Sequence, residues 1–222
     1  ERGSRSSLNL GRHLAASEGN LPIVEYLITQ GRASINATDR WGGTPLADAI
    51  RHAHASVLGN FLIKRVVYEI QEELPNIKNF GTLSPIPGFR DWFTTLNDKI
   101  IQNILGKIPY NNVSFLKSKD LKVGDGRIVS NKQAITRLVS HYLINEKNKK
   151  GRPINDVCRF HLGNGAIIDN ININANVSEV GFKRSYGVMV NYLYELKNIE
   201  KNHEEYINDK KIIISGQLKK KL

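Results

Sequence analysis

Hydrophobic positions recur at intervals of three and four residues between about His54 and Pro75. The apolar residues at this spacing are Val57, Leu58, Phe61, Leu62, Val66, Ile70 and Leu74. This period predicts an α-helix with one apolar face. Pro75 is expected to end it, because proline lacks a backbone N–H and clashes with the preceding turn. A second helical pattern follows and carries Trp92, Phe93, Leu96, Ile100, Ile101 and Leu105.

Strand-like patterns alternate with further helical ones in the rest of the chain. Residues 80–84 form a short extended run, and residues 187–194 form an aromatic, β-branched run that is expected at the centre of a sheet. Residues 155–163 are predicted to form a short helix with an Asn or Asp cap and an Asn-Gly stop, before a strand at residues 166–168. Ser130 begins a capping box for a helix that carries Ile135, Leu138, Val139, Tyr142 and Leu143. The second part of the chain is therefore predicted to have a mixed α/β fold.

The first part of the chain contains an internal repeat. Residues 13–28 resemble the helix pair of an ankyrin repeat, and residues 39–49 open another repeat at an offset slightly longer than the ankyrin period of about 33 residues. Thr44 is expected to cap a helix, and Pro45 fits the first turn, where no N–H is missed. The resemblance implies all-α helical hairpins in residues 1–56. Because fewer than about three repeats rarely stand alone, a structural remnant or cap is favoured over an independent binding module.

Composition changes near residue 56. Residues 1–56 are rich in alanine and use arginine in place of lysine, whereas every lysine lies in residues 57–222, which are also rich in asparagine and isoleucine. We therefore expect a junction between Ser56 and Val57. The helix predicted from about His54 would continue the last ankyrin-like helix into the second domain.

Net charge and cysteine content limit the classes of partner and compartment. The 222 residues carry a formal net charge of +11, so an anionic partner is expected. The lysine clusters, Lys147, Lys149, Lys150 and Lys219–Lys221, lack interleaved aromatic residues that could stack on bases, which disfavours nucleic acid. No apolar run approaches the roughly 18–20 residues of a membrane-spanning helix, and the N-terminal residues do not resemble a secretory signal. The single cysteine, Cys158, favours a reducing, cytoplasmic location.

Two polar residues are candidates for chemistry. Ser84 is expected at the end of the first strand, where the prolines on either side of Ile86 would hold it in a rigid corner. On this local evidence, a rigid turn without a chemical role is the favoured interpretation of Ser84. His161 falls in the last turn of its predicted helix, where the helix dipole is expected to raise its affinity for a proton.

Metal binding and a cysteine nucleophile are both disfavoured. His52 and His54 would point apart on a helix, so we expect no metal site. Cys158 lies three residues before His161, but no third group is evident that would orient such a pair. Packing is the favoured interpretation of Cys158.

Four sequence motifs in the second part of the chain occur in the same order in one enzyme family. They are Gly-Asn-Phe-Leu-Ile-Lys at 59–64, Leu-Ser-Pro-Ile-Pro-Gly-Phe at 83–89, Phe-His-Leu-Gly-Asn-Gly-Ala at 160–166 and Met-Val-Asn-Tyr at 189–192. From about Leu58 to Tyr194 the chain resembles the C-terminal half of the catalytic domain of the malonyl-CoA decarboxylases. The resemblance implies a partial GNAT-like acyltransferase fold in residues 57–222. It also implies conversion of malonyl-CoA to acetyl-CoA and carbon dioxide.

The resemblance also implies roles for individual residues. The catalytic serine of the family matches Ser84, and its catalytic histidine matches His161. Decarboxylation leaves an enolate that must be stabilised and then protonated; His161 is expected to donate the proton, and Ser84 either orients the malonyl carboxylate or stabilises the enolate. Gly59, Asn60 and Lys64 are expected at the coenzyme A diphosphate, although helix packing and a solvated lysine explain them equally well. No cofactor is expected besides the coenzyme A thioester, which is the substrate.

The resemblance is incomplete in two respects. The family has a helical domain and further strands before the residues that match Gly59, and ankyrin-like sequence stands there in this chain. Ile173 and Asn176 occupy positions where tryptophan and aspartate are usual. Two functions therefore follow. One is a malonyl-CoA decarboxylase-like enzyme, inactive if those strands are essential, and the other is a non-catalytic protein, either an ankyrin-type interaction module with a protein partner or a decayed fusion.

Overall fold

The computed structural model describes Ala15, Ile23, Tyr26, residues 66–67 and residues 69–222. The chain divides into two compact units, Glu1–Lys78 and Asn79–Leu222. The ankyrin-like segment, the predicted junction at residue 56 and most of the helix predicted from His54 lie outside the described residues. Those expectations stay predictions.

The described end of the first unit is helical. Residues 66–67 and 69–73 are helical, and the Leu74 N–H donates to the Ile70 carbonyl at 2.7 Å before the chain reaches Pro75. The predicted end of this helix is confirmed. The predicted apolar face is wrong at Val66, which is half exposed while its neighbour Val67 is buried. A three-to-four spacing admits either valine, and only the packing of the helix decides between them.

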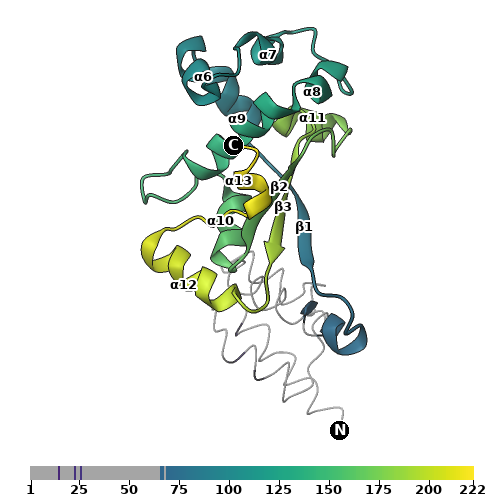
Figure 1. Cartoon of the computed structure of the whole chain (residues 1–222), viewed down its shortest axis with the longest axis vertical. Helices are drawn as coiled ribbons and strands as arrows, with labels where there is room; N and C mark the ends of the chain where they lie inside the picture. The colour runs from purple at the N-terminus through teal and green to yellow at the C-terminus, as the bar shows by residue number, and fades with distance from the viewer. Residues whose placement is uncertain (1–14, 16–22, 24–25, 27–65, 68) are drawn as a thin grey trace. The chain divides into compact units, whose positions relative to one another are not determined.

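The second unit is a mixed α/β structure, as predicted. Its strands are β1 Phe80–Pro85, β2 Ile167–Asn172 and β3 Met189–Tyr194. Its helices are α5 Phe89–Thr95, α6 Asp98–Leu105, α7 Asn111–Ser114, the 3-10 helix η1 Phe115–Lys117, α8 Gly126–Ser130, α9 Lys132–Ile144, α10 Asp156–Gly163, α11 Glu179–Ser185, α12 Ile199–Asp209 and α13 Gly216–Lys219. Within this unit, α6, α7, α8, α9 and α11 gather at one end of the sheet, and α10 and α12 lie toward the other end (Figure 1).

The sheet is antiparallel with the order β1-β3-β2, so β3 is central as predicted. Ser84 in β1 lies opposite Val190 in β3, and Val190 in turn lies opposite Ile171 in β2. Thr82 lies opposite Tyr192 in the next row. Paired residues in a sheet point to the same face, so these side chains share one face, and on β3 its residues are buried.

The apolar pattern at residues 92–105 was predicted as one helix, and this prediction is wrong. The chain forms α5 and α6 with a break at Leu96 and Asn97. Asn97 has an extended backbone, and its side chain accepts from the Ile100 N–H at 2.9 Å. Capping by asparagine begins a new helix here, although the hydrophobic period continues through the break.

The predicted capping box at Ser130 is also wrong. Ser130 is the last residue of α8, and its hydroxyl donates back to the Gly126 carbonyl at 3.1 Å. α9 begins at Lys132, and Asn131 precedes it without a side-chain capping bond. The polar run at residues 130–133 therefore separates two helices, and the first turn of α9 has no side-chain cap.

Asn155 joins the corner after β1 to the start of α10. Its Oδ1 accepts from the Cys158 N–H at 2.8 Å, which caps α10, and its Nδ2 donates to the Pro87 carbonyl at 2.8 Å. The Tyr142 hydroxyl donates to the same carbonyl at 3.0 Å. Asn155 is only 2% exposed, so both of its bonds are shielded from water.

The turn before α5 and the turn after α10 both require glycine. Gly88, at φ 81°, begins α5, and an added Cβ would lie 2.8 Å from the Tyr142 hydroxyl. Gly165, at φ 79°, follows α10, and an added Cβ would collide with the backbone oxygen of Ile199. The predicted Asn cap and Asn-Gly stop of the 155–163 helix are confirmed, because α10 ends at Gly163 with Asn164 as its C-cap.

The C-terminal tail extends the sheet beyond β2. The Ile168 N–H donates to the Ile213 carbonyl at 3.0 Å, and the Ser215 N–H donates to the Ile168 carbonyl at 2.9 Å. α13 then packs on β2. The tail therefore covers the edge of β2 that faces away from β3.

The two bonds of Asn155 lead to a prediction about stability. Asn155→Asp keeps an acceptor for the Cys158 N–H but has no donor for the Pro87 carbonyl, so it is expected to lower the free energy of unfolding by about 1–3 kcal/mol. Asn97→Asp is the matched control, because the bond described for Asn97 is the one that it accepts from Ile100. It is expected to change stability by less than about 0.5 kcal/mol. Urea denaturation measures both, and equal losses in the two variants would contradict the bridging role of Asn155.

Candidate active site

Ser84 occupies the buried end of β1. It is 5% exposed, and its Oγ lies 2.9 Å from Thr82 Oγ1 and 3.0 Å from His161 Nε2. Thr82 is two residues earlier on the same strand and therefore points to the same face. The residues after Ser84 leave the sheet at the proline corner, where Ile86 is fully buried. The corner therefore anchors the strand end that presents the serine hydroxyl.

His161 comes from the last turn of α10 and is 7% exposed. Its Nδ1 lies 2.7 Å from the Tyr194 hydroxyl. Its ring stacks on Tyr192, with ring centroids 4.3 Å apart and planes 20° from parallel. The aromatic face and two hydrogen bonds together fix the ring, so Nε2 can reach only the region around Ser84.

Four residues thus form one hydrogen-bonded series, the part-buried Thr82 and the buried Ser84, His161 and Tyr194, which we call the polar array. The sequence predicted two of its members, Ser84 and His161, and the structure brings their side chains into direct contact. Sequence reasoning missed Tyr194. The available signal was its place two residues after Tyr192 on the predicted central strand, which puts both tyrosines on the same face.

Burial determines the charge state of His161. Removal from water lowers its pKa from the ordinary value of 6.5 to about 4. The expectation that the helix dipole raises the proton affinity of His161 is therefore wrong. The dipole acts weakly at a helix end, whereas loss of hydration disfavours imidazolium strongly. The ring is neutral at pH 7.

The tyrosine in the array is also protonated. Burial raises the pKa of Tyr194, so its phenol keeps its proton. A neutral imidazole carries one N–H, and the array can be bonded in two directions. Either Ser84 donates to Nε2 and Nδ1–H donates to Tyr194, or Tyr194 donates to Nδ1 and Nε2–H points toward Ser84. In the second direction, the array presents a proton where Ser84 and His161 meet.

The other predicted candidates are separate from this site. Gly59, Asn60 and Lys64 lie outside the described residues, and their proposed contact with coenzyme A stays a prediction. Cys158 is fully buried in α10, its thiol donates to the Leu143 carbonyl at 3.7 Å, and burial raises its pKa to about 12. A thiol in that state is a poor nucleophile at neutral pH.

Among the residues that the structure describes, no three His, Cys, Asp or Glu side chains gather in a way that could hold a metal ion. In the same part of the chain, no helix is long and apolar enough to cross a membrane.

Comparison with sequence families gives two matches. Residues 51–222 match the family described as malonyl-CoA decarboxylase C-terminal domain. Residues 13–58 match the family described as ankyrin repeats (many copies). The two matches overlap at the position where the change in composition predicts the junction.

Individual proteins give the same assignment for the second part. Mitochondrial malonyl-CoA decarboxylase of Rattus norvegicus is 36% identical over 179 residues, which cover 72% of this chain and 36% of that protein. The crystal structure of malonyl-CoA decarboxylase from Rhodopseudomonas palustris aligns with a TM-score of 0.65 at 38% identity and covers 73% of this chain and 37% of that one. The structure from Cupriavidus metallidurans gives a TM-score of 0.61 at 34% identity, covering 81% and 46%. The chain spans little more than a third of the length of the curated relatives it matches.

The low pKa of His161 predicts how stability depends on pH. The folded pKa of about 4 lies below the ordinary value of 6.5, so the unfolded chain takes up a proton first as pH falls. The free energy of unfolding should therefore decrease between these two pH values, with a contribution of about 3 kcal/mol from His161. Urea denaturation as a function of pH measures this slope.

Two variants isolate the contribution of His161 from that of the carboxyl groups. His161→Gln should flatten the slope, whereas His203→Gln, which loses the bond of a part-buried histidine to the Gly163 carbonyl, should keep it. A His161 Cε1–H resonance that titrates near pH 6.5 in the folded chain would overturn the assignment.

Proposed function

Because the chain belongs to the malonyl-CoA decarboxylase family, we propose that its polar array decarboxylates malonyl-CoA to acetyl-CoA and carbon dioxide. The observation that carries this proposal is the 3.0 Å contact between Ser84 Oγ and His161 Nε2. The family resemblance predicted from four sequence motifs is confirmed by the matches of sequence and structure. The activity of this chain is the proposed step.

The reaction breaks the bond between the malonyl carboxylate carbon and the adjacent carbon. The electron pair of that bond moves into the thioester to form an enolate, and carbon dioxide leaves as a neutral molecule. A proton must then reach the enolate carbon to give acetyl-CoA. In the direction of bonding in which Tyr194 donates to Nδ1, His161 supplies that proton from Nε2–H. The phenol proton then passes to Nδ1, which keeps the imidazole neutral and leaves Tyr194 as a phenolate. A proton taken up from solvent restores the phenol, so each turnover consumes one proton.

Burial of the array suits this chemistry. A carboxylate loses its charge to an enolate during the reaction, and a site that excludes water does not favour the concentrated charge of the carboxylate. Ser84 and His161 are both more than nine-tenths buried. Ser84 takes one of the two roles expected from the sequence: it orients the malonyl carboxylate, or it donates a hydrogen bond to the enolate oxygen.

We propose the finer features of the fold and of substrate binding with the same function. The mixed α/β composition and the antiparallel sheet support a partial GNAT-like fold in the second part, and the match at residues 13–58 supports ankyrin-like hairpins in the first. Gly59, Asn60 and Lys64 lie inside the decarboxylase match and are the proposed contacts for the coenzyme A diphosphate. The proposed reaction uses no cofactor besides the coenzyme A thioester, which is its substrate.

Partners and compartment stay predictions. A protein partner of the ankyrin-like segment is expected from the sequence alone. The cytoplasmic location is expected from the single cysteine, whereas the rat and mouse relatives are named as mitochondrial proteins. The non-catalytic alternative has no described contact that favours it over the enzyme.

Release of acetyl-CoA from malonyl-CoA by the purified full chain tests the proposed activity. Ser84→Ala and His161→Ala are each expected to lower kcat by at least about 100-fold, since each removes a group that contacts the reacting atoms. Ser130→Ala, at an exposed serine that bonds only within α8, is the matched control and should leave kcat unchanged. A folded wild-type chain that releases no acetyl-CoA would contradict the proposal.

The two possible roles of Ser84 differ in kinetics. A hydrogen bond that orients the carboxylate already forms in the ground state, so its loss raises KM. A hydrogen bond that stabilises the enolate forms in the transition state, so its loss lowers kcat. We expect the effect of Ser84→Ala to fall mainly on kcat, because His161, the proposed proton donor, bonds directly to Ser84. An effect confined to KM would assign Ser84 to the carboxylate.

Tyr194→Phe tests the proton path through the array. It removes the hydroxyl bonded to Nδ1 and is expected to lower kcat by about 10- to 100-fold, because the imidazole then loses its proton without replacement. Tyr206→Phe is the matched control, since the Tyr206 hydroxyl is buried without a hydrogen-bond partner in the described structure. Unchanged kcat in Tyr194→Phe would exclude Tyr194 from proton transfer.

A further inference from the structure

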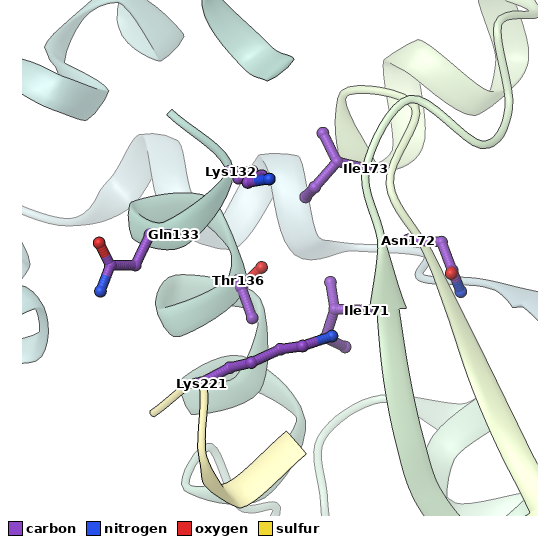
Figure 2. Close-up of a pocket in the computed structure, with 7 residues that line it drawn as sticks. All are labelled: Lys132, Gln133, Thr136, Ile171, Asn172, Ile173 and Lys221. Atoms are coloured by element: carbon purple, nitrogen blue, oxygen red, sulfur yellow. The ribbon is translucent and has the colours of Figure 1, made fainter. Parts of the chain in front are cut away.

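A cavity of about 550 Å³ lies between the start of α9 and the end of β2. It is lined by Lys132, Gln133, Thr136, Ile171, Asn172, Ile173 and Lys221 (Figure 2). None of these residues belongs to the polar array. The volume falls within the range of about 300–1,000 Å³ that is usual for small-molecule sites.

Thr136 supplies a hydroxyl to the lining of the cavity. The residue as a whole is only 6% exposed. Figure 2 shows the hydroxyl oxygen pointing into the space between α9 and β2. The hydroxyl can therefore form a hydrogen bond with a ligand in the cavity.

The polar groups around the cavity are positively charged. The ammonium groups of Lys132 and Lys221 lie on the cavity side in Figure 2. Lys221 Nζ donates to Asn170 Oδ1 at 2.6 Å. None of the lining residues is acidic. The first turn of α9 adds N–H groups without a side-chain cap, and the N-terminal end of a helix favours anions.

The opposite wall of the cavity is apolar. Ile171 is buried in β2, and Ile173 follows directly after the strand. The amide of Asn172 points away from α9 in Figure 2 and bonds to Asn191 on the other face of the sheet. A ligand that filled this space would therefore contact cations and a hydroxyl on one side and two isoleucines on the other.

We propose that the cavity binds a small organic anion that has an oxyanion head group and a short apolar body. The head group lies between Lys132 and Lys221 and accepts a hydrogen bond from Thr136. The apolar body packs on Ile171 and Ile173. Binding is non-covalent, and the proposal is independent of the proposed decarboxylation, because it uses none of the array residues.

Isothermal titration of the full chain with hexanoate, hexyl phosphate and hexanamide tests the proposal. These probes have the same apolar body, and only the first two are anions. At least one anion should bind about tenfold more tightly than hexanamide, since hydrogen bonds to charged groups contribute about 1.5–3 kcal/mol. The stronger of the two anions identifies the head group. Equal affinity for all three probes, or no binding of either anion, overturns the proposal.

Lysine variants locate the site. Lys132→Gln and Lys221→Gln are each expected to weaken binding of the preferred anion by about tenfold. Lys220→Gln is the matched control, because Lys220 is an exposed neighbour of Lys221 that does not line the cavity. All three positions are exposed, so the variants should fold. A loss of affinity in Lys220→Gln equal to that in Lys221→Gln would show that only general charge matters and would contradict a defined site.

Thr136→Val gives a second readout that a structural role would not produce. Valine has nearly the shape of threonine but no hydroxyl, so the variant should weaken anion binding by at least about threefold. An unchanged affinity in Thr136→Val, in a variant that melts like the wild-type chain, would contradict the role assigned to Thr136.

Discussion

The geometry of the candidate active site depends on one buried amide, that of Asn155. Its oxygen caps α10, and its nitrogen bonds to the Pro87 carbonyl in the corner that follows β1. The first bond fixes the residue at which α10, the helix of His161, begins. The second bond holds the start of that helix against the corner that follows Ser84. Ser84 and His161 are 77 residues apart in sequence. A single side chain that satisfies both elements therefore determines how their reactive atoms meet.

Because the array is shielded from water, it is stable only when its groups are uncharged and hydrogen-bonded to one another. In an environment of low dielectric constant, hydrogen bonds are strong, and an unpaired charge is costly. His161 is bonded at both ring nitrogens, and its pKa is lowered to about 4. The protonated tyrosine at the end of the series avoids a charge there as well. The same burial that removes the imidazolium also keeps the phenol of Tyr194 protonated, so a proton that passes from Tyr194 to His161 must be replaced from solvent.

The sequence predicted those features that depend on local chemistry. The Asn cap and Asn-Gly stop of α10 and the central position of β3 needed only capping and β-propensity, and both are confirmed. The break between α5 and α6 was missed because the apolar period continues across Asn97, and one capping residue outweighs the period there. The sign of the pKa shift of His161 was wrong because the helix dipole is a local property, whereas burial depends on the whole fold. Tyr194 was missed for a related reason, since its contact with His161 exists only when β3 lies beside α10.

A β-bulge explains how one face of the sheet serves both the array and the cavity. The pairing of β2 with β3 shifts between Ile168 and Asn170. In a regular strand, Ile168 and Ile171 would point to opposite faces, but the extra residue brings both onto the face of Ser84. Asn170 and Asn172 then share the other face, where they bond to each other at 2.9 Å and Asn172 bonds to Asn191 at 2.6 Å.

The same shift fixes the polarity of the two faces. Without it, Asn170 would stand opposite Val190 in the buried row and Ile171 would lie on the face of Asn191, which would leave a polar amide in an apolar core. The bulge therefore restores the apolar alternation of β2 at the point where the strand reaches the cavity. Because Ser84, Val190 and Ile171 form one continuous row across the sheet, the wall of the cavity and the serine of the array are held by the same strand register.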